Sequence, residues 1–253
     1  MPRLAASVEM MFREVPLLDR FERAAAAGFR GVEIQSPYGE TKEDIAERVR
    51  RHGLAAVLMN VLPGVAAIPG REAEFRSALT RALAYAEAAG CPQLHCVAGR
   101  TDDANAEATF VANLKWAAET ARRVGVRLLI EPLNTRDNPG YFLTGTAQAR
   151  RILDQVGSDN VLLQYDCYHM QVMESDLAET VKAHIDVIGH FQVAGVPGRH
   201  EPDPAQEIDY TSLFALIDSL GYDGWVGCEY HPRKDTVEGL SWARPYGIRD
   251  GRS

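Results

Sequence analysis

The sequence predicts an α/β protein folded as one closed (β/α)8 barrel, the TIM barrel architecture, with residues 1–253 forming a single domain. Two observations carry this prediction. Eight short apolar runs alternate with eight helical segments, and no linker or change in composition divides them. The length of 253 residues is also ordinary for such a barrel. An open doubly wound sheet fits less well, because no glycine-rich dinucleotide-binding motif follows an apolar run.

In the first half of the chain, four apolar runs each precede a helix that ends at a glycine. Apolar residues recur at helical spacing at Leu17, Phe21 and Ala25, which indicates a helix with one buried stripe. Thr41 precedes Asp44 by three residues, close to a capping box, and is expected to start the second helix. The predicted strands span residues 4–8, 29–34, 54–59 and 93–97, and the predicted helices span 16–27, 41–52, 71–89 and 104–124.

The second half repeats this pattern with apolar runs that end in polar residues. Residues 128–130 and 161–163 are continuous and apolar, which is typical of parallel strands buried on both faces. Gly157 and Gly221 are expected to close two of the helices. The chain beyond about residue 245 is expected to be frayed. The predicted strands span residues 127–133, 161–166, 187–194 and 224–230, and the predicted helices span 147–156, 174–185, 209–220 and 236–242.

The composition limits the classes of partner and the compartment. A formal net charge of −8 disfavours nucleic acid, since phosphate binding needs clustered Lys and Arg. The N-terminus shows no signal-peptide core, and no apolar run is long enough to cross a bilayer. The four cysteines form no CxxC pair, which favours buried thiols in a reducing compartment. We therefore expect a cytoplasmic protein without a membrane or nucleic-acid partner. The oligomeric state stays open, a homo-oligomer included.

Four predicted strands end in an oxygen-bearing side chain: Glu131, Asp166, Gln192 and Glu229. The carboxyl ends of the strands form the active-site face of such barrels. Carboxylates gathered there require a positive partner, because burying each bare charge is costly. Oxygen ligands suit a hard divalent cation, Mg²⁺ or Mn²⁺, and the absence of Cys and His among the four disfavours a structural zinc site. The sequence therefore predicts a metal site made by these four residues.

Strand alternation predicts which neighbours share the inner face of the barrel. Residues expected to point inward, one layer deeper than the four strand ends, are Leu129, Gln164, His190 and Gly227. Residues expected to point outward to the helices are Tyr165, Val226 and Cys228. The inward polar residues would form a layer that orients the metal-binding side chains above them.

Several candidate residues also have simpler explanations. Glu131 could cap a helix or pair with an arginine. Asp166 could be the N-cap of the segment that follows it, residues 167–170. Gln192 alone could be structural. Glu33, at the end of the second strand, could join the site, although a salt bridge to a nearby arginine is the simpler interpretation.

Three further residues are candidates for binding a substrate. His169 follows Asp166 by three residues and could donate a hydrogen bond to a substrate oxygen, or it could be a surface histidine. Arg199, on the long loop after the seventh strand, could clamp a substrate carboxylate, or it could be solvated. Asn60, at the start of the loop after the third strand, is the third predicted substrate ligand.

Several longer motifs carry a resemblance to a known family. They are Gly28-Phe29-Arg30-Gly31-Val32-Glu33, Ile68-Pro69-Gly70-Arg71-Glu72, Leu129-Ile130-Glu131-Pro132-Leu133-Asn134, Leu143-Thr144-Gly145-Thr146, Gln164-Tyr165-Asp166-Cys167-Tyr168-His169-Met170-Gln171 and Gly224-Trp225-Val226-Gly227-Cys228-Glu229-Tyr230. With these, nearly the whole chain resembles the hydroxypyruvate isomerase family of the xylose-isomerase-like barrel superfamily. The resemblance implies that Glu131, Asp166, Gln192 and Glu229 hold the metal. It also implies that Glu131 and Glu229 are the catalytic proton donor and acceptor.

The expected function is a metal-dependent isomerase that interconverts hydroxypyruvate and 2-hydroxy-3-oxopropanoate by proton transfer through an enediolate. Residues 61–67 and 203–206 depart from the family pattern, and both segments are expected to border the barrel mouth, where they bear on substrate choice. An isomerase or 3-epimerase of a longer sugar acid, such as 2-oxotetronate, is the alternative with the same glutamate pair. A metal-dependent endonuclease and a non-catalytic barrel that binds a small acid are more distant alternatives.

Overall fold

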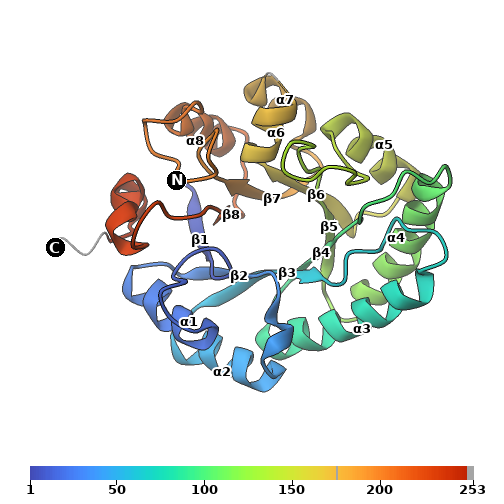
Figure 1. The fold of residues 1–253 in the computed structure, drawn as a ribbon, viewed down its shortest axis with the longest axis horizontal. Helices are drawn as coiled ribbons and strands as arrows, with labels where there is room; N and C mark the ends of the chain where they lie inside the picture. Colours follow the sequence, from blue (N-terminus) through green and yellow to red (C-terminus); the bar gives the residue numbers. More distant parts are fainter. Residues whose placement is uncertain (175, 250–253) are drawn as a thin grey trace.

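The computed structural model describes residues 1–174 and 176–249, and it confirms the predicted (β/α)8 barrel. Eight parallel strands pair in chain order, and β1 pairs with β8 to close the ring. The strands lie at the centre and the helices form an outer ring around them (Figure 1). The strands are β1 (Arg3–Ser7), β2 (Gly31–Ile34), β3 (Ala55–Val61), β4 (Gln93–Cys96), β5 (Arg127–Ile130), β6 (Val161–Asp166), β7 (Ile188–Val193) and β8 (Trp225–Cys228).

The outer layer contains the eight helices that the sequence predicts and two further short ones. The helices are α1 (Leu17–Ala26), η1 (Pro37–Gly39), α2 (Lys42–Arg51), α3 (Glu72–Ala89), α4 (Ala106–Arg122), α5 (Thr146–Val156), α6 (Cys167–Met173), α7 (Leu177–His184), α8 (Tyr210–Ser219) and η2 (Val237–Tyr246). Neither η1 nor α6 is among the eight predicted helices, although the sequence analysis considered Asp166 as an N-cap for residues 167–170, where α6 begins. The last element was expected to be a helix over 236–242, and it is a longer 3₁₀ segment.

Boundaries shift where the local sequence interrupts pairing. The prediction extended the fifth strand to residue 133, but β5 ends at Ile130. Pro132 lacks a backbone N–H and cannot donate to the ladder, so the chain leaves the sheet directly after the run of three apolar residues. Glu131 therefore lies just beyond the strand rather than inside it. At Thr41 the structure confirms the predicted cap, because its hydroxyl accepts a hydrogen bond from the Asp44 N–H at 3.1 Å.

Two separate apolar clusters confirm the predicted inner and outer faces of the strands. A small cluster inside the barrel contains Ala5, Val57, Leu58 and Leu129. A large cluster between the barrel and its helices includes the three residues expected to point outward, Tyr165, Val226 and Cys228. Because the inner apolar cluster is small, polar side chains fill the part of the barrel near the carboxyl ends of the strands. The candidate site lies there.

The end of the described chain packs against the first helix. Ile248 is 5% exposed, and the Arg249 N–H donates to the Ala27 carbonyl at 2.7 Å. The part of the expected frayed tail that covers residues 250–253 lies outside the described residues. None of the helices in the described part of the chain is long and apolar enough to cross a membrane.

Candidate active site

The four predicted metal ligands all lie at the carboxyl ends of β5 to β8. Glu131 and Glu229 directly follow β5 and β8, Asp166 is the last residue of β6, and Gln192 lies near the end of β7. Glu131, Asp166 and Gln192 are buried, and the Glu229 side chain is 15% exposed. Neighbouring strands place Asp166 and Gln192 opposite each other in the ladder. The structure thus brings the four residues to one mouth of the barrel.

Gln164 links two of these residues from below. Its Nε2 donates to Glu131 Oε2 at 2.8 Å and to Gln192 Oε1 at 2.6 Å. The side chain is 1% exposed and points inward, as strand alternation predicts. Gln164 therefore orients the Glu131 carboxylate and the Gln192 amide towards the mouth.

Arg199 links the other two. Its Nη2 lies 3.3 Å from Asp166 Oδ2 and 2.9 Å from Glu229 Oε2, and its Nε donates to the Glu229 carbonyl at 3.3 Å. The guanidinium also lies 5.2 Å from the centre of the Tyr168 ring. The side chain is only 20% exposed, so Arg199 is part of the site and is not a solvated loop residue.

The backbone holds Arg199 in this position at some cost. Its φ of 54° is in the left-handed region, which is unfavourable for a residue with a side chain. Residues on either side compensate, because Gly195 and His200 form a bridge and the Arg199 carbonyl accepts from the His231 N–H at 2.8 Å. The loop is therefore built to deliver this guanidinium to the carboxylates.

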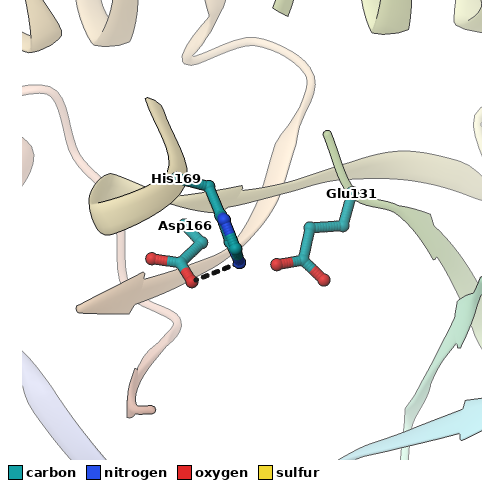
Figure 2. Close-up of side chains that lie close together, drawn as sticks. All are labelled: Glu131, Asp166 and His169. Carbon is teal, nitrogen blue, oxygen red and sulfur yellow. Dashed lines mark ion pairs between the residues drawn. The ribbon is translucent and has the colours of Figure 1, made fainter. Parts of the chain in front are cut away.

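His169 lies beside Asp166 and Glu131 and is buried, so the interpretation as a surface histidine is wrong. Figure 2 shows the three side chains facing one another across the mouth, with His169 Nε2 3.6 Å from Asp166 Oδ2. One ligand atom from each of the three lies within 4.8 Å of the others, which is close enough for a shared metal ion, and the protonation of the His169 ring decides whether it could be a ligand.

The hydrogen bonds of His169 indicate how it takes part. Its Nδ1 accepts from the Asn134 backbone N–H at 3.2 Å and lies 2.8 Å from Asn134 Nδ2. Asn134 Oδ1 accepts from the Asp137 N–H, which fixes Nδ2 as the donor towards the ring. Burial lowers the pKa of His169 to about 4, so the ring is neutral and its proton sits on Nε2. In this tautomer Nε2 offers a hydrogen-bond donor to the site and no lone pair for a metal.

The two glutamates carry strongly shifted pKa values in the metal-free protein. Burial, together with the charges of Glu229 and Asp166, raises the pKa of Glu131 well above its usual range. Burial raises the pKa of Glu229 to about 8, although Arg199 opposes the shift. Burial alone would lower the pKa of Arg199, but Glu229, Asp166 and Glu131 outweigh it and raise that pKa. Perturbed carboxyl groups of this kind at the carboxyl ends of barrel strands are candidates for proton transfer.

The donor set fits a divalent cation. Among the described residues, Glu131 Oε1 is buried without a hydrogen-bond partner, which leaves a lone pair available at the mouth. Carboxylates from Glu131, Asp166 and Glu229 and the amide oxygen of Gln192 are hard ligands that suit Mg²⁺ or Mn²⁺. A cation there would also offset the cost of burying these carboxylates and the repulsion between them.

Asn60, the third predicted substrate ligand, lies near the end of β3 on the other side of the mouth from β7. Its Oδ1 is buried and has no hydrogen-bond partner in the described chain. The next strand places His95 opposite it in the ladder. The sequence analysis did not identify His95, whose two ring nitrogens are likewise buried and without hydrogen bonds among the described residues.

His95 also contacts the site directly. Its Nδ1 lies 3.3 Å from Glu131 Oε2. Burial lowers the pKa of His95 to about 3, so the ring is neutral and the contact is not an ion pair. The signal that the sequence offered was a polar residue inside the predicted strand 93–97. With Asn60, His95 supplies unused polar atoms at the mouth, on β3 and β4, and His95 lies beside Glu131.

Glu33 joins the network beneath the mouth, and its expected salt bridge to an arginine is wrong. Its carboxylate contacts His190, Gln35 and Gln192 at 2.5–3.0 Å. The side chain is fully buried. His190 and Gln164 thus form the inward polar layer that strand alternation predicts, with Glu33 as an additional member.

Comparison with known proteins places this fold and site in context. A family model described as a xylose isomerase-like TIM barrel matches residues 21–246. A 2-oxo-tetronate isomerase from Cupriavidus necator is 47% identical over 97% of this chain and 99% of its own. A hydroxypyruvate isomerase from Escherichia coli is 43% identical over 97% of this chain and 100% of its own.

A solved structure also aligns over almost the whole molecule. The crystal structure of an AP endonuclease, family 2, from Brucella melitensis superposes with a TM-score of 0.96 at 44% identity. The alignment covers 98% of this chain and 100% of that one. Both the sequence and the arrangement of elements are therefore shared along the full barrel.

Proposed function

This chain is an isomerase of the xylose isomerase-like TIM barrel family, and on that premise we propose that it shifts the carbonyl of a short 2-oxo acid to the neighbouring carbon. In the three-carbon case hydroxypyruvate and 2-hydroxy-3-oxopropanoate interconvert through an enediolate. The observation that carries the proposal is the placement of two glutamates, Glu131 and Glu229, directly after β5 and β8 at one mouth of the barrel, with Asp166 and Gln192 between them.

Glu131, Asp166, Gln192 and Glu229 would hold a divalent cation, with Mg²⁺ or Mn²⁺ favoured by their oxygen atoms. Such a cation supplies Lewis-acid stabilisation of the negative charge that develops on the substrate oxygens. Gln164 supports two of these residues through its amide hydrogens. Because both hydrogen bonds come from one side chain, Glu131 and Gln192 keep a fixed relation to each other.

Glu131 and Glu229 would move the proton. They follow strands separated by β6 and β7, so they approach a substrate in the mouth from different directions. One carboxylate would remove the proton from the hydroxyl-bearing carbon, and the other would return a proton to the former carbonyl carbon. The hydroxyl proton passes from the first carbon's oxygen to the former carbonyl oxygen, which completes the isomerisation. Positioned acid–base groups of this kind contribute about 10²–10⁴-fold to the rate.

His169 and Arg199 would orient the substrate. The Nε2–H of His169 points into the mouth and can donate to a substrate oxygen. The Arg199 guanidinium can bind a substrate carboxylate through Nη1, because its Nε and Nη2 contact Glu229 and Asp166. Asn60 would receive the far end of the substrate, because its free Oδ1 lies on the opposite side of the mouth.

The test uses hydroxypyruvate in D₂O with Mn²⁺ or Mg²⁺, followed by proton NMR of the C3 hydrogens. The wild-type protein is expected to exchange these hydrogens for deuterium only with metal present. Glu229→Gln and Glu131→Gln should each lower turnover about 10²–10⁴-fold while the circular dichroism spectrum is unchanged. Absence of exchange with every small oxo acid would indicate a binding protein rather than an enzyme, and wild-type rates in either variant would refute the assigned pair.

A four-carbon substrate is the second candidate, favoured by the 47% identity to a 2-oxo-tetronate isomerase. The chemistry and the glutamate pair are the same, and only the length of the substrate differs. The ratio of kcat/KM for 2-oxotetronate over hydroxypyruvate decides between them, with a ratio above one assigning the longer acid. DNA is the weaker candidate, because the net charge of −8 opposes binding to phosphates.

A further inference from the structure

Glu33 is an unusual residue to find inside a barrel. It lies in β2, which β8 and β1 separate from β7, and its side chain is fully buried. Its ion-pairing partner in the described chain is His190, at 2.5 Å from Nε2 to Oε1, and no lysine or arginine there pairs with it. Burying a carboxylate without a permanent cation is costly. Gln or Leu would fill the space at lower cost, so the fold alone does not explain the charge.

The charge has one clear effect on Gln192. Gln192 Nε2 lies 3.0 Å from Glu33 Oε2. An ionised carboxylate only accepts hydrogen bonds, so the amide must present its NH₂ group to Glu33. Gln192 Oε1 must then face the other way, where it accepts from Gln164 at 2.6 Å and keeps a second lone pair. Glu33 therefore determines that the oxygen end of the Gln192 amide, and not its NH₂ end, is available as a ligand at the barrel mouth.

The same hydrogen bonds continue to a catalytic glutamate. Gln164 Nε2 donates to both Gln192 Oε1 and Glu131 Oε2. Gln164 can donate to Gln192 only while the oxygen end of that amide faces it. The orientation set by Glu33 thus reaches Glu131 through three hydrogen bonds, from β2 through β7 and β6 to the residue after β5.

Gly227 leaves the space that this arrangement needs. A Cβ at position 227 would lie 1.9 Å from Glu33 Oε1 and 2.4 Å from its Cδ. Any side chain there would push the carboxylate away. The backbone of β8 is therefore shaped around the Glu33 carboxylate.

We propose that Glu33, held by His190, is a positioning residue that fixes the Gln192 amide oxygen and the Glu131 carboxylate for binding the divalent cation. The inference rests on the proposed metal-dependent function. Glu33 acts through Gln192 and Gln164 and touches neither substrate nor metal. A glutamine at position 33 would permit either orientation of the Gln192 amide, because its own amide can donate or accept.

The experiment measures Mn²⁺ affinity by electron paramagnetic resonance of free Mn²⁺, without substrate. Glu33→Gln is expected to weaken Mn²⁺ binding about 10–100-fold, the range typical of groups that orient metal ligands. Ser7→Ala is the matched control. Ser7 is equally buried, but its hydroxyl donates only to Gln35 at the far end of the network, so Mn²⁺ affinity should stay at the wild-type level.

Gly227→Ala provides a second variant that keeps every polar group. Its new Cβ displaces the Glu33 carboxylate, so it should weaken Mn²⁺ binding in the same direction. If folded Glu33→Gln and Gly227→Ala both bind Mn²⁺ like the wild type, the inference is overturned while the proposed function stands. If neither variant folds, Glu33 serves the fold and the inference is again overturned. If the wild type itself binds no divalent cation, the proposed metal dependence fails and this inference fails with it.

Discussion

At the scale of single residues, burial decides which groups are charged. His95 and His169 are neutral at pH 7 because burial lowers their pKa values to about 3 and about 4. They can therefore offer hydrogen bonds without adding positive charge beside the carboxylates. Arg199 supplies the positive charge instead, and it contacts both Asp166 and Glu229. Neutral histidines thus supply hydrogen bonds in the site, and the Arg199 guanidinium supplies positive charge.

The four cysteines give a prediction at the same scale. All are free and buried. Burial raises the pKa of Cys91 and of Cys96 to about 12, and it raises those of Cys167 and Cys228 as well. A raised pKa keeps the thiol protonated, so at pH 8 about one in ten thousand Cys91 groups is a thiolate, against roughly a quarter of free cysteine.

Iodoacetamide at pH 8 should therefore label none of the four thiols in the native protein and all four after unfolding, as counted by mass spectrometry. Rapid labelling of the native protein would show that a thiol is exposed. The predicted cytoplasmic location is compatible with four free thiols and stays a prediction.

Individual positions show how far the sequence could predict the site. Glu131, Asp166, Gln192 and Glu229 could be found because each ends an apolar run, and parallel strands in a barrel bring such ends together. The role of Glu33 could not be predicted, because its partner His190 is 157 residues away and contact between them depends on ring closure. For the same reason His95 could not be placed beside Glu131 before the packing was known.

At the scale of elements, Asp166 has two functions at the junction of β6 and α6. Its Oδ1 accepts from the Tyr168 N–H at 2.8 Å and caps α6, while its Oδ2 faces His169 and Arg199. The sequence analysis treated the cap and the metal ligand as alternatives. The structure shows the cap, and the second oxygen stays available to the mouth. The short helix α6 therefore begins at the active site and carries His169 into it.

Two substitutions at Asp166 separate these functions. Asparagine is also a good N-cap, whereas alanine is not, so Asp166→Ala should be less stable than Asp166→Asn by about 1 kcal/mol in urea unfolding. Both variants lose the charge, and both should lose roughly 100-fold or more in metal-dependent turnover. Equal stability of the two variants would show that the cap contributes little, and full turnover in Asp166→Asn would remove Asp166 from the metal site.

At the scale of the whole molecule, the ring joins residues from distant parts of the chain into one electrostatic unit. The carboxylates come from β5, β6 and β8, and Glu33 comes from β2. Burial, and to a lesser extent the neighbouring carboxylates, disfavours the charged forms of Glu131 and Glu229 and raises their pKa values, so keeping these groups ionised opposes folding. A cation that binds only the folded barrel would offset this cost and stabilise the whole fold.

Adding Mn²⁺ or Mg²⁺ should therefore raise the melting temperature. At a metal concentration 100 times Kd the expected stabilisation is about 2.7 kcal/mol, or roughly 5–10 °C for a chain of this size. Differential scanning calorimetry measures the melting temperature with the metal and after its removal by EDTA. A sample with NaCl at the same ionic strength, and no divalent cation, is the control. An unchanged melting temperature would contradict a metal site in the barrel mouth.

The pairing of β1 with β8 has a consequence for biosynthesis. Strand β1 leaves the ribosome long before β8 (Trp225–Cys228), the strand with which it pairs, has been translated. Until then both flanks of the growing sheet stay open, and Glu33 has neither His190 nor Gln192 to meet. In a nascent chain stalled before residue 190, Glu33 would thus be solvated. The barrel mouth and its polar network would form only when synthesis is almost complete.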